Sequence, residues 1–287
     1  MLRHRPESVD LLILGAGWTS TFLIPALDHA QITHTETTTS GRDSTIPFKF
    51  DPESSDVEPY QHLPSATTVL VSFPLTGTGQ SKNIVSLYRS AHGDENHWIQ
   101  LGSTGIFNQL ENGWSTENSP YDNKNARAIA EDELLSIGGS VLNLCGLWGG
   151  VRKPETWIDR IVKSKEDVKN RNSVHFIHGE DVARAIIGVH RRFNEGKRWL
   201  VTDLRVYDWW DLILSFSALV EGNVDGEERD SLEVREKKIT LGKWVVELMK
   251  EEDVRALPRG MDSLSRKLDS TTFWEWIGVW PAHRRLA

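Results

Sequence analysis

The sequence predicts an α/β fold, a doubly wound parallel sheet with a small, mostly helical C-terminal cap. Short apolar runs alternate with segments of helical pattern over residues 1–204, as expected for a parallel sheet and its crossover helices. The run Leu11–Leu14 leads directly into Gly15-x-Gly17, a strand-to-helix turn typical of nucleotide-binding sheets. Residues 205–287 lack this alternation. We therefore predict a nucleotide-binding domain over 1–204, with an insertion near 153–172 that contributes to the cap, and a small substrate or cap region over 205–287.

Each strand is predicted from an apolar or β-branched run that ends at turn residues. In chain order the strands are Leu11–Leu14, Ile32–Thr39, Thr67–Phe73, His97–Gly102, Val141–Cys145, Ser173–Ile177 and Arg198–Thr202. Helices are predicted over Trp18–Asp28, Lys82–Ser90, Asn125–Ile137 and Asp181–Phe193. Pro25 should kink the first helix, and Gly138-Gly139 should end the third. The charged stretch Glu221–Lys238 is predicted to be a solvated loop.

The composition of the chain argues against several classes of binding partner. The 287 residues carry a formal net charge of −8 and no long run of lysine or arginine, so nucleic acid and anionic membranes are poor partners. The single cysteine, Cys145, suits a reducing compartment and lies in an apolar run, so we expect a buried thiol. Leu11–Leu14 is too short for a signal peptide or a membrane span. We expect a cytoplasmic protein that acts on a small-molecule substrate.

The glycine turn is the first candidate binding site. Gly15 permits the tight turn, and Gly17 lets the backbone approach the phosphates of a dinucleotide closely. The next helix directs its N–H groups at their negative charge, which involves Trp18, Thr19 and Ser20. Ser20 stands where a third glycine is usual, so the motif is incomplete. The alternative is a strand that turns into a helix and binds nothing.

Six segments in a consistent order extend this signal: GAGW at 15–18, LVSFP at 70–74, LGSTGIF at 101–107, ENSP at 117–120, LCGLWGGVR at 144–152 and FIHGEDVARAI at 176–186. Together they resemble the extended and atypical branches of the short-chain dehydrogenase/reductase superfamily, close to its NAD-dependent epimerase/dehydratase group. The resemblance covers about the first 210 residues. It implies a Rossmann-type sheet that binds a nicotinamide nucleotide.

The end of the second strand decides between NAD and NADP. NAD-binding members carry an acidic residue there for the ribose 2′-hydroxyl, but the sequence near Thr39 has none. Glu36 lies too early and is expected to point elsewhere. Ser40 and Arg42 offer donors and a positive charge that suit a 2′-phosphate. NADP is therefore expected rather than NAD, unless Arg42 is simply a solvated loop residue.

The resemblance also implies further contacts. The residues expected beneath the adenosine side of the cofactor are Ser72, Phe73 and Pro74, and those expected beside the nicotinamide are Gly146, Leu147 and Trp148. His178 and Asp181 fall where relatives pin a loop, but a helix cap by Asp181 and a structural histidine explain them better. His175, His178 and His190 lack metal-ligand spacing with any cysteine or carboxylate cluster, so no metal site is expected.

Catalysis in this superfamily uses a serine or threonine, a tyrosine that transfers the proton, and a lysine four residues later that lowers the tyrosine pKa. Ser103 stands at the serine position, with Thr104 as the alternative. Counting back from Glu131, the tyrosine and lysine positions hold Asn123 and Arg127. An asparagine cannot replace a phenol as a proton donor at neutral pH, whereas an arginine still supplies a fixed positive charge.

The nearest substitute pair is Tyr121 with Lys124, which Pro120 places just before the helix. Three interpretations follow. The protein is an NADP-dependent oxidoreductase of small carbonyl or alcohol substrates, a catalytically silent nucleotide-binding regulator or scaffold, or a redox-neutral isomerase or lyase. Aromatic residues after 204 either wall the substrate pocket or pack the cap onto the larger domain, and they are Trp209, Trp210, Trp274 and Trp276. A homodimer through the helices near 82–90 and 125–137 is a further expectation.

Overall fold

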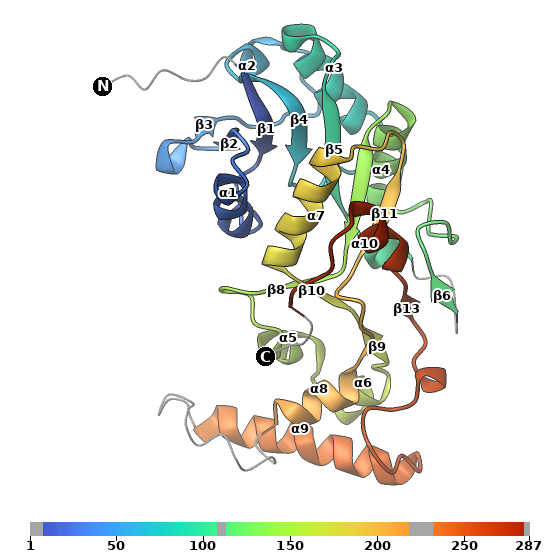
Figure 1. Cartoon of the computed structure of the whole chain (residues 1–287). Coiled ribbons are helices and arrows are strands. Elements are labelled where there is room, and N and C mark those ends of the chain that lie inside the picture. Colours follow the sequence, from blue (N-terminus) through green and yellow to red (C-terminus); the bar gives the residue numbers. More distant parts are fainter. Residues whose placement is uncertain (1–7, 108–112, 218–231, 284–287) are drawn as a thin grey trace.

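The computed structural model describes residues 8–107, 113–217 and 232–283. A seven-stranded sheet runs through the larger part of the molecule in the order β11-β7-β5-β4-β1-β2-β3, and every neighbouring pair is parallel (Figure 1). Its strands are β1 (Ser8–Leu14), β2 (His34–Thr38), β3 (Ile46–Pro47), β4 (Ser65–Val71), β5 (His97–Ser103), β7 (Ser140–Leu144) and β11 (Arg198–Val201). The predicted doubly wound sheet is confirmed.

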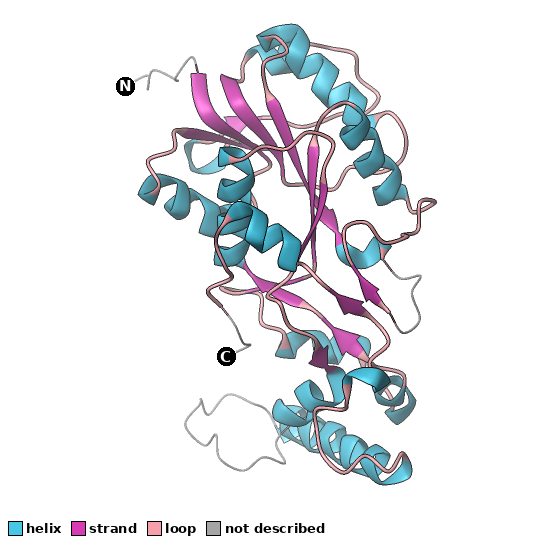
Figure 2. Ribbon diagram, turned by 45° about the vertical axis from the view of Figure 1, so that its right-hand side comes forward, coloured by secondary structure: helices cyan, strands magenta, loops and turns pink. Residues whose placement is uncertain are grey.

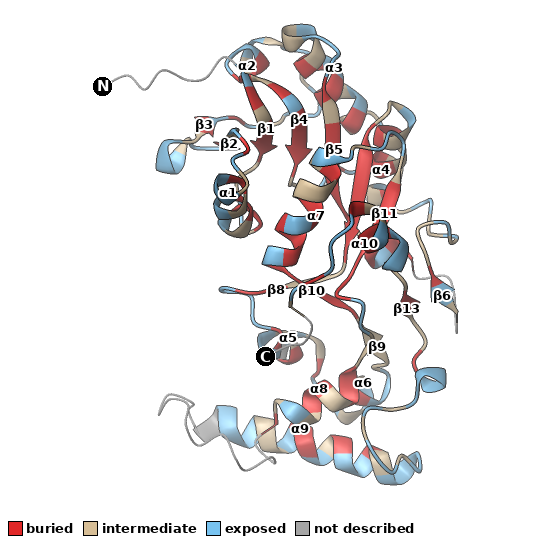
Figure 3. Ribbon diagram, viewed as in Figure 1, coloured by how far each residue is buried: buried red, intermediate tan, exposed pale blue. Residues whose placement is uncertain are grey.

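Helices cover both faces of the sheet (Figure 2). Alternate residues of a strand point to opposite faces, so Leu11 and Ile13 join one apolar core while Leu12 and Leu14 join the other. The first core includes α1 (Ser20–His29), α7 (Gly179–Arg191) and α10 (Thr271–Ile277). The second includes α2 (Glu58–Gln61), α3 (Gln80–His92) and α4 (Ala126–Ser136). Figure 3 shows the central strands as an almost continuously buried layer.

A third apolar core lies below the sheet in Figure 1 and joins two segments distant in sequence. Its helices are α5 (Glu155–Ile161), α6 (Lys165–Lys169), α8 (Trp209–Ser215) and α9 (Leu232–Glu251). Trp210 is 2% exposed, and its indole N–H donates to the Val168 carbonyl at 2.8 Å. Trp209 and Trp210 therefore pack the cap. The predicted loop Glu221–Lys238 ends early, because α9 begins at Leu232; its residues 221–231 lie outside the described ones.

The end of the chain returns to the sheet. Trp274 is fully buried in the first core, and its indole N–H donates to the Thr202 carbonyl at 2.9 Å. Trp276 stacks on Trp199 with ring centres 4.6 Å apart. By these contacts α10 packs against the main sheet, although it lies in the region that the sequence assigns to the cap.

One predicted strand of the main sheet is wrong. Residues 173–177 form parts of two short strands, β9 (Ser173–Val174) and β10 (Phe176–His178). β10 pairs with β8 (Gly146–Trp148), and β9 pairs with β12 (Tyr207–Asp208). The remaining pair is β6 (Trp114–Ser115) with β13 (Lys267–Leu268). In Figure 1, β8, β10 and β9 lie between the main sheet and the helices of the cap. No helix in the described ranges is long and apolar enough to cross a bilayer.

Candidate nucleotide-binding site

A cavity of about 350 Å³ opens at the carboxyl edge of the main sheet. Its walls include the residues that end or follow β1, β4, β5 and β7, which are neighbours in the sheet. The strand order reverses between β1 and β4, and doubly wound sheets bind ligands at such a reversal. The lining residues are Gly15, Gly17, Trp18, Thr19, Ser72, Phe73, Leu101, Gly102, Ser103, Arg127, Leu144, Cys145, Leu147 and Arg152.

The glycine turn forms one wall. Gly15 has φ +92°, and a Cβ there would lie 2.8 Å from Phe73 Cδ1, so the turn requires glycine. A Cβ on Gly17 would meet no atom within 4 Å. The Gly15 N–H donates to Thr37 Oγ1 at 3.0 Å, which ties the turn to β2. Trp18 and Thr19 line the cavity, whereas Ser20 is buried as the first residue of α1, and its hydroxyl has no partner in the described part of the chain.

The end of β2 carries no carboxylate. Thr39 and Ser40 are exposed there, and Glu36 is held within the strand by a hydrogen bond to His34. Arg42 Nη2 donates to the Ala16 carbonyl at 3.2 Å, so its positive charge lies beside the glycine turn. Its other terminal nitrogen lies 3.3 Å from the carboxylate of Asp43, and both side chains are exposed. Thr39, Ser40 and Arg42 lie outside the cavity lining.

Of the other residues predicted to contact the cofactor, some line the cavity and others do not. Ser72, Phe73 and Leu147 line the cavity, and Pro74 is exposed outside it. Alternate residues of β8 face opposite ways, so Gly146 and Trp148 are turned away from the side of Leu147. A Cβ on Gly146 would lie 2.9 Å from the His175 carbonyl, and Trp148 packs on His178 with ring centres 4.6 Å apart.

Of the predicted catalytic residues, the structure brings Ser103 and Arg127 to the cavity. Thr104 is buried and its hydroxyl donates to the Leu144 carbonyl at 3.3 Å. Lys124 is exposed and does not line the cavity. The Tyr121 hydroxyl donates to Asp132 Oδ1 at 2.7 Å, also outside the lining. Burial and this carboxylate raise the pKa of Tyr121, the opposite of what a proton donor needs.

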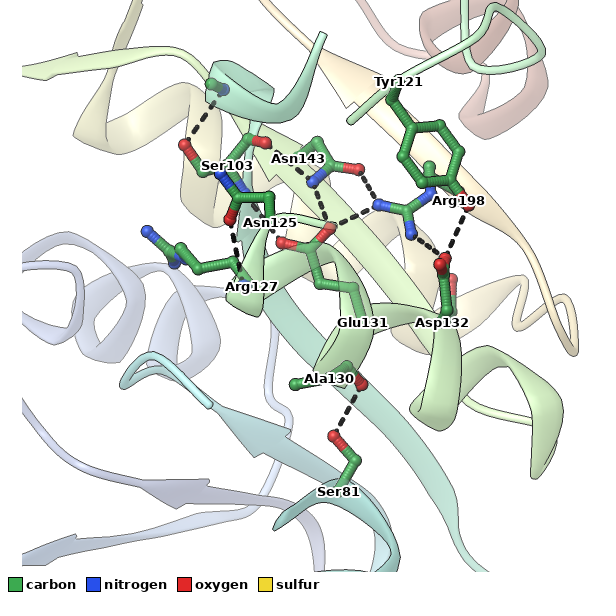
Figure 4. Close-up of polar contacts among 12 residues, drawn as sticks. Ser81, Ser103, Tyr121, Asn125, Arg127, Ala130, Glu131, Asp132, Asn143 and Arg198 are labelled. Carbon is green, nitrogen blue, oxygen red and sulfur yellow. Dashed lines mark hydrogen bonds and ion pairs between the residues drawn. The ribbon is translucent and has the colours of Figure 1, made fainter. Parts of the chain in front are cut away.

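Behind Ser103 lies a buried polar network centred on Glu131, which is fully buried on α4 (Figure 4). The Ser103 N–H donates to Glu131 Oε1 at 3.1 Å, and Asn143 Nδ2 donates to Glu131 Oε2 at 2.8 Å. Arg198 pairs with Glu131 and also with Asp132, the latter at 2.7 Å. The network fixes the backbone of Ser103, while Figure 4 shows the Ser103 and Arg127 side chains on the side opposite Arg198.

His178 and Asp181 hold the start of α7 and residues 282–283. His178 Nδ1 accepts from the Glu180 N–H at 3.2 Å, so the cap is the histidine rather than Asp181. The buried Asp181 accepts from the N–H groups of Ala282 and His283 at 2.7 and 3.0 Å. Possible metal ligands of His178, Glu180 and His283 lie within 4.8 Å of one another. Because His178 caps the helix and its ring stacks on His283, we assign no metal there.

The charges of the cavity suit a nicotinamide dinucleotide. Arg127 and Arg152 line it, no carboxylate is among the lining residues, and Arg127 Nε is buried with no acceptor among the described residues. A bound pyrophosphate would supply the negative charge that the lining residues of the cavity lack. Cys145 lines the cavity too, but burial raises the pKa of its thiol well above its ordinary value. The sequence did not indicate Arg152, although it ends the motif LCGLWGGVR.

No family model and no curated protein matches the sequence. Solved structures do match its fold. A functionally unknown conserved protein from Silicibacter pomeroyi is 17% identical, with 96% of this chain and 95% of that chain covered and a TM-score of 0.62. A protein from Methylobacillus flagellatus, provisionally described as an NAD-dependent epimerase/dehydratase, is 14% identical over 96% and 94%, with a TM-score of 0.58.

RMD from Pseudomonas aeruginosa, solved with NADPH, is 12% identical over 95% of this chain and 94% of that one, with a TM-score of 0.56. Similarity at these identities concerns the fold. The chain thus has the Rossmann-type α/β fold found in NAD-dependent epimerase/dehydratase-like and short-chain dehydrogenase/reductase-like proteins.

Proposed function

We propose that the protein binds NADP(H) in the cavity at the carboxyl edge and transfers hydride to or from a small carbonyl or alcohol substrate. The observation that carries the proposal is the glycine turn after β1, which lies at the reversal of strand order and opens into that cavity. Gly15, Gly17, Trp18 and Thr19 would hold the pyrophosphate. Ser72, Phe73 and Leu147 would line the rest of the nucleotide.

The preference for NADP rests on the end of β2. A carboxylate that would bind the 2′-hydroxyl and repel a 2′-phosphate is missing at Thr38, Thr39 and Ser40. The hydrogen bond to the Ala16 carbonyl already directs the Arg42 side chain toward the glycine turn. Its pair with Asp43 is exposed and therefore weak, so a phosphate can replace that partner.

When bound, the cofactor supplies or accepts the hydride. Ser103 Oγ already accepts from the Gly105 N–H at 3.1 Å, which leaves its own O–H to donate to the substrate oxygen. Arg127 supplies a permanent positive charge that stabilises the developing alkoxide. No phenol, imidazole or carboxylate is among the lining residues, so water delivers the proton and turnover is slow.

A catalytically silent nucleotide-binding regulator is the second candidate. It is favoured by one observation, the bond between Tyr121 and Asp132, which keeps a tyrosine with a raised pKa away from the cavity. Both candidates require nucleotide binding, and only the first requires turnover.

Substitution of the cavity residues tests the proposal. In Ser103→Ala, turnover of NADPH with aldehydes or ketones should fall at least tenfold, because the group that polarises the carbonyl is lost, while the Kd for NADPH stays within about twofold. Arg127→Met should also reduce turnover at least tenfold. Both are measured by NADPH absorbance and by calorimetric titration.

Lys124→Met is the matched control, since it removes an exposed positive charge from the segment just before α4. It should change neither quantity. NADPH binding without turnover on any carbonyl compound tested would support the silent regulator instead. Absence of binding to NADPH and NADH would contradict both candidates.

A further inference from the structure

The loop that follows β8 reverses the chain sharply at the rim of the cavity. The Gly149 N–H donates to the Arg152 carbonyl at 2.9 Å, and the Arg152 N–H donates back to the Gly149 carbonyl at 3.1 Å. Gly149 and Gly150 have φ values of +114° and +56°, which place both in the region that favours glycine. Val151 at the tip is 90% exposed. This turn fixes the position of the Arg152 backbone, from which the side chain extends.

The same loop is fastened to the glycine turn, although the two are more than 130 residues apart in sequence. The Trp18 indole N–H donates to the Gly149 carbonyl at 3.1 Å. The Arg152 guanidinium carbon lies 4.3 Å from the centre of the Trp18 ring, a cation–π contact. Trp18 in turn packs against Phe22 of α1 at 5.0 Å between ring centres. Arg152 is thereby held directly beside the start of α1.

The guanidinium of Arg152 makes no ion pair with any carboxylate in the described ranges, and it lines a cavity wall that contains no acid. Its five N–H donors form a planar fork that matches two phosphate oxygens. Burial lowers the pKa of Arg152, but an arginine remains charged at neutral pH.

We propose that Arg152 binds the pyrophosphate of the nicotinamide nucleotide, as the second half of a phosphate site whose first half is the glycine turn. This inference rests on the proposed nucleotide binding. Of the groups of the nucleotide, the pyrophosphate is the one expected beside Arg152. Arg152 is held against Trp18, which directly follows Gly17 and precedes the first turn of α1. A 2′-phosphate would instead meet Arg42 at the end of β2, and a substrate oxygen would meet Ser103.

Two variants, Arg152→Met and Arg42→Met, distinguish the pyrophosphate from the 2′-phosphate. Each variant is titrated calorimetrically with NADPH, NADH and adenosine 2′-monophosphate. Arg152→Met should weaken NADPH and NADH by the same factor, about tenfold or more, because one charge-assisted contact is lost from both. It should leave adenosine 2′-monophosphate, which has no pyrophosphate, within about twofold. Arg42→Met should weaken NADPH and adenosine 2′-monophosphate but not NADH.

Lys153→Met is the matched control, because it removes an exposed charge from the next residue without touching the cavity lining. It should bind all three ligands as the wild type does. Arg152→Lys retains the charge without the fork, so an intermediate weakening of NADPH and NADH is expected. Melting temperatures of the unliganded variants should match that of the wild type.

If Arg152→Met and Arg152→Lys bind NADH with wild-type affinity, the inference is overturned while the proposed function stands. It is also overturned if Arg152→Met weakens only the ligands that carry a 2′-phosphate. If the wild type binds neither NADPH nor NADH, the proposed function itself fails, and that result is distinguishable from both.

Discussion

His175 illustrates how one buried side chain joins segments that are distant in sequence. Its Nδ1 donates to the Arg205 carbonyl at 2.8 Å, and its Nε2 accepts from the Leu268 N–H at 3.2 Å. The bond from the Leu268 N–H needs the neutral ring, because a protonated Nε2 could only donate, to the Arg266 carbonyl 3.3 Å away. Burial accordingly lowers the pKa of His175 to about 4, from 6.5 for a free histidine. The side chain thus connects the residues after β11 to β13.

The pH dependence of stability follows from this shift. Because the folded-state pKa lies below the unfolded one, the stabilisation is present above pH 6.5 and is lost as pH falls toward 4. The loss attributable to His175 is about 3 kcal/mol at most. Urea unfolding at pH 7 and pH 4.5 measures it. His175→Gln should be less stable than the wild type at pH 7 and should lose less stability on acidification.

His62→Gln is the control, because His62 is an exposed histidine whose side chain is 62% accessible. Its unfolding free energy should follow the wild type at both values of pH. If His175→Gln loses as much stability on acidification as the wild type does, this explanation of the pH dependence is wrong.

Among the elements, the glycine turn was predictable from sequence and the loop after β8 was not. The turn needs glycine at Gly15 for a local reason, a positive φ, so the residue type itself signals the structure. Three-residue strands such as β8 and β10 are set by the strand that they pair with, and local sequence does not reveal that partner. The sequence did not indicate Arg152 for the same reason, because its position depends on a contact with Trp18, which is distant in sequence.

The two glycines of the turn should respond differently to alanine. Gly15→Ala should lower the unfolding free energy by roughly 1–3 kcal/mol, because its φ is positive and the Cβ would contact Phe73. Gly17→Ala should leave stability nearly unchanged, since its Cβ would meet open space, yet weaken NADPH binding by blocking the approach of the phosphates. Chemical unfolding and calorimetric titration check the two effects. Equal stability loss in both variants would contradict this account of the turn.

At the scale of the whole molecule, the fold class was predictable because strands and helices alternate along the first two thirds of the chain. The predicted domains at 1–204 and 205–287 stay a prediction. The structure adds that α10 covers the sheet while α8 and α9 pack with α5 and α6. Sequence patterns did not assign α10 to the sheet, because the core that a short apolar segment joins depends on contacts distant in sequence.

The role of α10 predicts a large effect from a single substitution. Trp274→Ala should lower the unfolding free energy by about 3–5 kcal/mol, because a fully buried indole and its bond to Thr202 are lost. Trp280→Ala serves as the comparison, since that tryptophan is 49% exposed, and its cost should be within about 0.5 kcal/mol. Thermal and urea unfolding provide both values. Similar losses in the two variants would show that α10 does not stabilise the sheet.

Calorimetric titration of the purified protein with NADPH and NADH tests the central claim most directly. We predict saturable one-to-one binding of both nucleotides, tighter for NADPH, and loss of that difference in Arg42→Met. A protein with native unfolding behaviour that binds neither nucleotide would contradict the account.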